Sequence, residues 1–446
     1  MVHLVVQISK YVMIFLMLIY TFECFYVFRY QKTEEERKAV FHIQRMLIFF
    51  FHFDAYLVLY LTTENFEIVA FYLSQLMLFA TMILIYRMCY KASSDLLLNN
   101  MVLLMCIGLI MLTRLSYGKA IRQFIFMIVG TVIALIIPVI LKKLSLFRRL
   151  TWLYAVIGIG LLGVVAVCGQ TSYGAKLSIS IAGISIQPSE FVKIIFAFYI
   201  AGMLYEKQNL KQLIITSICS AFFVLMLVAS KDLGGALLYF ITYLVMIYVA
   251  TQKLYYFVGG FGLLAVASFI GSRLFSHVGT RILAWKDPLS VIDNQGYQVC
   301  QSLFGIGTGG WFGLGLNQGR PKKIPVVEND FIFAAISEEM GAVFALCLIM
   351  VCISCFFMIM NIAMKLKDNF YKLVVVGLAT LYAMQVFLTI GGVIKFIPST
   401  GVTLPLVSYG GSSLISTMIV FGVIQGLYIR EASSKGGEHG KEKTVE

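Results

Sequence analysis

Residues 331–360 read FIFAAISEEMGAVFALCLIMVCISCFFMIM, and Glu338 and Glu339 are the only charged residues in this stretch. An α-helix rises about 1.5 Å per residue, so about 20 apolar residues cross the hydrocarbon core of a bilayer. The stretch is too long for a barrel strand and lacks the strict alternation of such strands. It therefore predicts a membrane-spanning helix.

Twelve further apolar runs are long enough to cross a membrane in the same way. They lie at approximately 11–28, 46–62, 67–86, 96–113, 123–141, 151–167, 188–205, 212–229, 234–250, 254–275, 373–394 and 404–428. Of the 446 residues, 60% are hydrophobic and only 13% are charged, and the mean hydropathy is +0.89. Because a soluble domain is roughly a quarter charged, this composition excludes a cytosolic globular enzyme and a secreted disulfide scaffold. We expect an all-α polytopic membrane protein.

The positions of lysine and arginine predict how the chain is oriented in the membrane. The formal net charge is +13. If the N-terminus is outside, alternation places the basic clusters at 29–45, 142–149 and 365–372 in the cytoplasm, as the positive-inside rule requires. The cluster at 114–122 is the main exception on the outer side. The basic excess is therefore a signature of topology, and we expect membrane lipids and no nucleic acid as partners.

One connection, residues 276–330, is external in this orientation and contains no spanning run. Loops of this length in compact proteins usually serve a function. Asp330 ends the loop where the chain enters the membrane, and its carboxylate could be a general base, bind a cation, or only cap the next helix. Basic residues nearby would suit a phosphate-bearing ligand. They are Arg320, Lys322 and Lys323.

Other ionisable residues at membrane depth are informative because they are costly to bury. Glu190 and Lys193 lie three residues apart on one predicted helix face, where they could line a polar cavity or form a structural ion pair. Asp232 precedes the helix predicted at 234–250, either as a functional carboxylate or as its N-cap.

Two further groups of polar residues have both a structural and a functional interpretation. Glu338 and Glu339 are about 100° apart on a helix, so they cannot both face one cavity, and we expect one of them to make structural hydrogen bonds. The segment 405–413 places small polar residues, among them Ser408 and Ser412, in an otherwise apolar run. It predicts either close helix packing or a broken helix that lines the same cavity as Asp330.

Six sequence blocks, in the same order, resemble the signature blocks of the SEDS family of membrane peptidoglycan polymerases (FtsW/RodA/SpoVE). They are Gln187–Lys193 (QPSEFVK), Lys231–Leu237 (KDLGGAL), Tyr297–Leu303 (YQVCQSL), Gly307–Gly315 (GTGGWFGLG), Asp330–Gly341 (DFIFAAISEEMG) and Pro398–Ser413 (PSTGVTLPLVSYGGSS). The resemblance covers about residues 96–430 and implies the family's ten-helix core, with the large external loop before the eighth core helix. Residues 1–95 are then an N-terminal extension with about three transmembrane helices, and residues 431–446 are expected to be a disordered cytoplasmic tail.

The resemblance also implies an activity and a site. The family polymerises glycan strands from lipid II at the outer face of the bacterial cytoplasmic membrane, typically with a class B penicillin-binding protein. By this resemblance Asp330 is the catalytic residue. No cofactor is expected, although a divalent cation could bridge the pyrophosphate to Asp330 or Glu338. The residues expected to bind substrate are Glu190, Lys193, Asp232, Glu338, Glu339, Ser408 and Ser412.

Two other functions are compatible with the sequence. A lipid II flippase or transporter would also use broken helices and buried ion pairs, but it would place its main charges near the membrane midplane. Asp330 lies instead at the outer mouth, which suits chemistry on substrate that has already crossed. A scaffold of the cell-wall synthesis complex, without activity of its own, is the other alternative. A role in division, elongation or sporulation is left open.

Overall fold

The computed structural model describes residues 2–29, 33–143, 146–172, 175–181, 184–206 and 209–442. Each of the thirteen predicted runs overlaps one long helix. These helices are α1 (Val2–Tyr26), α2 (Glu34–Thr63), α3 (Glu67–Cys89), α4 (Asp95–Leu115), α5 (Tyr117–Lys143), α6 (Thr151–Cys168), α7 (Pro188–Leu204), α8 (Leu210–Ala229), α9 (Leu233–Thr251), α10 (Leu254–Leu274), α13 (Ile332–Lys365), α14 (Asn369–Val393) and α15 (Gly411–Glu442). By length and composition, twelve helices in the described part of the chain could cross a membrane, and each has at least 18 residues. The helix α7 has 17 residues and is just shorter than these. The predicted all-α polytopic fold is confirmed.

Side chains at the helix starts explain several of these boundaries. Thr33 and Glu36 form a reciprocal capping box at the start of α2. Ser94 accepts a hydrogen bond from the amide of Leu97 at the start of α4. Pro188 occupies the first turn of α7, where a missing N–H leaves no hydrogen bond unmade. These helix starts therefore follow from local sequence.

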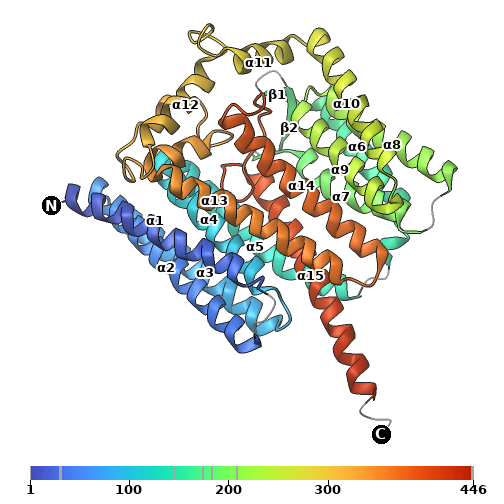
Figure 1. Ribbon diagram of the computed structural model, residues 1–446, viewed down its shortest axis with the longest axis horizontal. Helices are drawn as coiled ribbons and strands as arrows, with labels where there is room; N and C mark the ends of the chain where they lie inside the picture. The colour runs from blue at the N-terminus through green and yellow to red at the C-terminus, as the bar shows by residue number, and fades with distance from the viewer. Residues whose placement is uncertain are drawn as a thin grey trace.

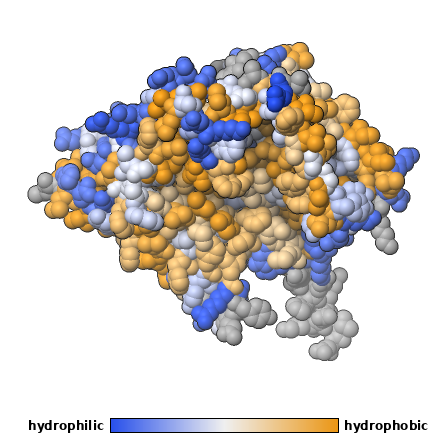
Figure 2. Space-filling model, turned by 45° about the horizontal axis from the view of Figure 1, so that its top comes forward, coloured by the Kyte–Doolittle hydropathy of each residue, from blue (hydrophilic) through white to orange (hydrophobic). Residues whose placement is uncertain are grey.

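The helices form one bundle with α4 in its interior, where its whole apolar stretch is buried. In Figure 1, α1, α2 and α3 lie together on one side of the bundle, next to α4, α5 and α13, whereas α6, α8 and α10 lie on the other. The apolar stretch of α10 is not buried within the chain at all. Figure 2 shows hydrophobic side chains over most of the visible face, with hydrophilic ones in its upper part and along its edges. Such a surface suits contact with lipid.

About half of the predicted large loop is helical. It contains α11 (Ser276–Lys286), α12 (Tyr297–Gly309) and the 3₁₀-helix η2 (Pro321–Lys323). In Figure 1, α11 runs from α10 across one end of the bundle, and α12 returns toward α13. The end of the bundle that carries these three elements is the loop end. The starts of α7, α9 and α15 lie there too, so this end brings together the residues from which a site could be built.

The last predicted run, 404–428, becomes helical only at Gly411. The residues before Gly411 form turns, in which Leu406 has a φ of +66°. Pro405 disfavours helical geometry only in the residue before it. The positive φ of Leu406 and the hydrogen bond from the Tyr409 amide to the carbonyl of Glu328, at 2.8 Å, keep the following residues out of a helix. At its other end, α15 is assigned as far as Glu442. The disordered tail expected at residues 431–446 stays a prediction. Residues 443–446 lie outside the described part of the chain.

The connection before α7 forms a small antiparallel sheet. The strands are β1 (Gln170–Ser172), β2 (Ala175–Ile181) and β3 (Ile184–Ile186), in the order β1-β2-β3. Leu177, Ile179 and Ile181 alternate with polar residues along β2, which is the period of a strand with one apolar face. The sheet is too short to cross a membrane and leads directly into α7.

Candidate active site

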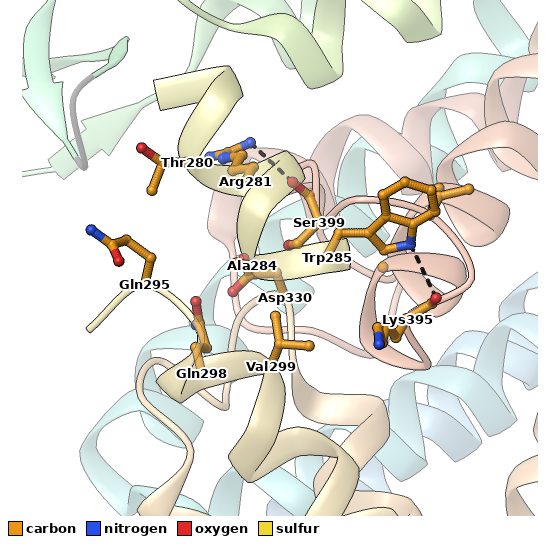
Figure 3. A pocket seen from close by; sticks show the side chains of 12 residues that line it. Thr280, Arg281, Ala284, Trp285, Gln295, Gln298, Val299, Asp330, Lys395 and Ser399 are labelled. Atoms are coloured by element: carbon orange, nitrogen blue, oxygen red, sulfur yellow. Dashed lines mark hydrogen bonds between the residues drawn. The ribbon is translucent and has the colours of Figure 1, made fainter. Parts of the chain in front are cut away.

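Asp330 lies at the loop end beside a cavity of about 160 Å³ (Figure 3). The cavity is enclosed by α11, the turn before α12, the start of α12, and the end of α14 with the segment that follows it. Asp330 is the one carboxylate among the lining residues, which also include the cations Arg281 and Lys395. The complete lining is Thr280, Arg281, Ala284, Trp285, Gln295, Gln298, Val299, Asp330, Gly392, Lys395, Ile397 and Ser399.

The surroundings of Asp330 make it more basic than an exposed aspartate. Burial raises the pKa of Asp330 from its usual value of 3.8 to about 6, while a hydrogen bond from its own backbone and the charge of Arg281 act in the opposite direction. A carboxylate with this pKa is mostly ionised at neutral pH and can accept a proton there. General bases work best when their pKa is near the operating pH.

Arg281 and Asp330 both lie close to Gly401. A methyl group at Gly401 would lie 3.6 Å from Arg281 Nη2 and 3.9 Å from Asp330 Oδ2. The two side-chain atoms are therefore at most 7.5 Å apart, which is the sum of those two distances. Gly401 has a φ of +74°, a conformation that glycine adopts readily. The glycine thus turns the chain beside both charged side chains.

Two hydrogen bonds fasten α11 to the segment after α14. Arg281 Nη1 donates to the carbonyl of Ser399 at 3.3 Å, and Trp285 Nε1 donates to the carbonyl of Lys395 at 3.1 Å (Figure 3). Arg281 and Trp285 are four residues apart, so they lie on one face of α11. One wall of the cavity is therefore a docked helix.

Asp232 lies near the cavity and caps a helix. Its carboxylate accepts a hydrogen bond from the amide of Gly235 at 2.9 Å, at the start of α9. Burial raises the pKa of Asp232 and the bond from Gly235 lowers it, while Glu190 raises it and Arg281 lowers it. The N-cap interpretation is confirmed, and the charge of Arg281 acts on both Asp232 and Asp330.

Glu190 and Lys193 form an ion pair of 2.5 Å in the first turns of α7. The Lys193 side chain is 3% exposed and also donates to Gln385 Oε1 at 2.9 Å. Ser416 Oγ donates to Glu190 at 2.9 Å. The pair therefore joins α7 to α14 and α15, and it does not line the cavity of Asp330. Its contacts match the structural interpretation of the pair.

Glu338 and Glu339 both make structural contacts, although we expected this of only one of them. Glu338 Oε1 accepts a hydrogen bond from the amide of Arg320 at 2.6 Å. Glu339 is fully buried, pairs with Arg114 Nε at 3.0 Å and accepts a hydrogen bond from the amide of Asn317 at 3.2 Å. Neither glutamate lines the cavity. They hold the end of the loop segment 311–320 against the start of α13.

Ser408 and Ser412 also lie outside the cavity lining. Ser408 Oγ accepts a hydrogen bond from the amide of Leu404 at 2.9 Å, and Ser412 Oγ accepts one from the amide of Gln187 at 3.0 Å. These bonds shape the turns before α15 and join them to the start of α7. The basic residues expected to meet a phosphate are exposed and outside the lining as well. They are Arg320, Lys322 and Lys323.

Of the two carboxylates that could bridge a divalent cation to the pyrophosphate, Asp330 and Glu338, only Asp330 lines the cavity. Glu338 is bonded to the amide of Arg320. Within the described ranges, no group of three or more His, Cys, Asp and Glu side chains is placed to hold a metal ion.

The family model of cell cycle proteins named for FtsW, RodA and SpoVE matches residues 94–432. This chain belongs to that family. The peptidoglycan glycosyltransferase RodA of Mycobacterium leprae is 34% identical over 373 residues, which cover 78% of this chain and 80% of the relative. The stage V sporulation protein E of Bacillus subtilis is 34% identical over 368 residues, which cover 75% of this chain and 96% of the relative. The SEDS resemblance is confirmed.

Two solved structures share the fold of this SEDS chain. One belongs to a peptidoglycan synthase complex that coordinates polymerization and crosslinking; its TM-score is 0.64 at 24% identity, with 75% of this chain and 97% of that chain covered. The other is the crystal structure of the rod shape determining protein RodA of Thermus thermophilus, with a TM-score of 0.56 at 22% identity and coverage of 75% and 96%. The family model begins at residue 94, which lies after α3.

Sequence reasoning missed the residues that surround Asp330 in this SEDS chain. Arg281 and Trp285 are four residues apart in a stretch that ends at Pro288, and this spacing could have indicated a short helix with both side chains on one face. Lys395 gives no comparable signal, because single cations are common in loops.

Proposed function

We propose that this SEDS chain polymerises lipid II into glycan strands with Asp330 as the general base. The 4-hydroxyl of the acceptor sugar gives its proton to Asp330, and its oxygen attacks the anomeric carbon of the lipid-linked donor. The glycosidic bond forms while the bond from that carbon to the pyrophosphate breaks, and undecaprenyl pyrophosphate leaves with the electron pair. The observation that carries the proposal is a carboxylate with a pKa of about 6 beside a cavity at the loop end that two cations, Arg281 and Lys395, also line.

The cations of the cavity have a second role in this proposal. The pyrophosphate gains negative charge as it leaves, and a fixed cation beside it lowers the barrier. We assign this role to Arg281 and Lys395, which line the same cavity as Asp330. Lys193 is buried in its pair with Glu190, so we assign it to holding α7 in place.

We also propose where the chain works and with which partner. The relatives named peptidoglycan glycosyltransferase support the activity, and the fold is shared with a chain of a peptidoglycan synthase complex that couples polymerization to crosslinking. A class B penicillin-binding protein would supply the crosslinking here. The distribution of Lys and Arg supports the bacterial cytoplasmic membrane with the loop end outside, where translocated lipid II is available.

The test reconstitutes the full-length protein in vesicles with its class B partner, adds lipid II and resolves the glycan products on a gel. General base catalysis typically contributes about 10²–10⁴-fold, so Asp330→Asn should lower the rate by at least about 100-fold. Asp293→Asn changes an exposed carboxylate of the same loop outside the cavity lining, and it should keep wild-type activity. The assignment of the base fails if Asp330→Asn polymerises as fast as wild type.

A lipid II flippase is the second candidate function. The buried ion pair of Glu190 and Lys193 is the observation that would suit a carrier. However, the pair lies in the first turns of α7 at the loop end, whereas carriers bind substrate near the midplane. Fluorescent lipid II scrambled by the vesicles, without polymer, would favour the flippase. A non-catalytic scaffold would show neither activity.

A further inference from the structure

The N-terminal extension, α1 to α3, contacts the large loop although it lies before the region that the family model matches. On α1, Lys10 Nζ donates to the carbonyl of Gly313 at 3.2 Å. At the end of α2, Thr62 Oγ1 accepts a hydrogen bond from Asn317 Nδ2 at 2.9 Å. Two helices of the extension therefore hold the loop segment 311–320 through polar contacts.

Apolar contacts reinforce these hydrogen bonds. The rings of Tyr11 and Phe312 have centroids 5.8 Å apart. Val6 lies so close to Gly315 that a methyl group on that glycine would be 3.1 Å from Val6 Cγ1. Leu316, the next residue, is fully buried. The 311–320 segment is thus packed against α1 as well as bonded to it.

The opposite side of the same segment is bonded to the start of α13. The amide of Gly315 donates to the carbonyl of Glu339 at 2.8 Å, and the amide of Asn317 donates to the side chain of Glu339 at 3.2 Å. The amide of Leu314 donates to the carbonyl of Glu338 at 3.0 Å. The segment therefore lies between the family core on one side and the extension on the other.

The extension is itself fixed to the core by buried polar contacts. Tyr20 on α1 donates to Asn100 Oδ1 on α4 at 2.8 Å, and Asn100 Nδ2 donates to Ser354 Oγ on α13 at 2.7 Å. Ser9 Oγ donates to Asp54 Oδ2 at 2.6 Å and so joins α1 to α2 beside Lys10. Buried hydrogen bonds with matched partners favour one arrangement of helices. The extension can therefore hold the loop in a defined position.

The held segment leads directly to the cavity. The chain runs from Arg320 through η2 to Pro325, whose carbonyl accepts a hydrogen bond from Gln298 Nε2 at 2.8 Å. Gln298 lines the cavity, and Asp330 follows five residues after Pro325. A shift of the 311–320 segment would therefore move the loop on which Asp330 is carried.

We propose that Lys10 and Thr62 are positioning residues that hold the 311–320 segment so that Asp330 stays in its reactive position. The proposal rests on the proposed polymerase function. Since neither residue lines the cavity, their loss should affect the geometry of the base more than the binding of substrate. A displacement of about 1 Å at a reacting group can lower a rate by about 100-fold.

The experiment compares Lys10→Met/Thr62→Val with wild type in the reconstituted lipid II assay and by hydrogen–deuterium exchange of peptides that cover 311–330. Loss of two hydrogen bonds, one of them to a charged group, should lower kcat by about tenfold, with KM changed less than about twofold. Exchange in the peptides should increase. Lys10→Arg/Thr62→Ser keeps both polar groups and should restore kcat. Lys91→Met, an exposed lysine of the same extension, is the matched control.

The proposal is overturned if kcat of Lys10→Met/Thr62→Val stays within about twofold of wild type. An equal loss in Lys91→Met would also overturn it, because the effect would then not belong to the contacts with the loop. If wild type makes no polymer, the proposed function fails. The hydrogen–deuterium exchange of residues 311–330 then decides alone whether Lys10 and Thr62 hold the segment. Unchanged exchange across 311–330 would then overturn the positioning role, and increased exchange would support the contacts on which it depends.

Discussion

Replacement of Arg281 by methionine should shift the pH dependence of polymerisation toward higher pH. Asp330 acts as a base in its ionised form, so activity is lost as the pH falls through its pKa, which burial raises to about 6. The Arg281 cation favours the ionised carboxylate and lowers this pKa. Removing the cation therefore raises the pKa of Asp330 further, and the acidic limb of the kcat/KM profile should move upward.

The size of the shift follows from the distance between the two groups. Arg281 Nη2 and Asp330 Oδ2 are at most 7.5 Å apart, because 3.6 Å and 3.9 Å separate them from one point. At an effective dielectric constant of about 20, two unit charges at that distance interact by about 2.2 kcal/mol. Arg281 is exposed, so we halve this value for screening by water. At 1.36 kcal/mol per pH unit, the acidic limb should move by about one unit.

The assay measures initial polymerisation rates at limiting lipid II between pH 5 and pH 9. Arg281→Lys keeps the charge and should leave the limb close to that of wild type. Lys286→Met removes an exposed cation from the end of α11, outside the cavity lining, and serves as the matched control. Any titration of the substrate is common to all variants and cancels in the comparison. An acidic limb that is identical in Arg281→Met and wild type would falsify the electrostatic link between Arg281 and the base.

Three further substitutions separate structural residues from functional ones. Lys193→Met leaves the partly buried Glu190 carboxylate without its cation and should lower the free energy of unfolding in denaturant by about 3 kcal/mol, whereas an unchanged unfolding midpoint would contradict a stabilising ion pair. Arg114→Met removes the ion pair of Glu339 and should make the loop segment 311–320 more sensitive to limited proteolysis, with about 2–3 kcal/mol lost in stability. Gly401→Ala strains a residue with a φ of +74° by about 1 kcal/mol and puts a methyl group beside Asp330. The loss in kcat/KM, converted to free energy, should therefore exceed the loss in unfolding free energy. Equal losses in the two free energies would show that the glycine serves only the turn.

The spanning helices could be predicted because each depends on local composition. A chain segment in the bilayer core must satisfy its backbone hydrogen bonds internally. A run of about 20 apolar residues therefore forms an α-helix there. The late start of α15 could not be read from Pro405, because Pro188 shows that a proline can also begin a helix. The short sheet before α7 was missed for a different reason. Its three strands are too short for hydropathy to detect, and only the alternation in β2 indicated them.

Asp330 could be predicted from the sequence as a candidate site residue, because it is an acidic residue where a long loop enters an apolar run. Its neighbours could not be identified in that way, since Arg281 is on α11 and Lys395 follows α14. Arg281 is held in place by a hydrogen bond to the backbone carbonyl of Ser399, and it lies near Asp330 at Gly401. Neither depends on a pattern that adjacent residues would show.

Asp330, Glu338 and Glu339 lie within ten residues of one another, yet they differ in what their oxygens already bind. Glu338 and Glu339 accept hydrogen bonds from loop amides, at Arg320 and Asn317. If such a carboxylate takes up a proton or turns toward a substrate, its amide partners lose their hydrogen bonds. Each partner left unsatisfied costs the protein about 1–3 kcal/mol of free energy. Asp330 instead faces a cavity with room for a ligand. Substitution of either glutamate should therefore appear first as a loosened loop and only through it as lost chemistry, whereas substitution of Asp330 should remove the chemistry from a folded protein.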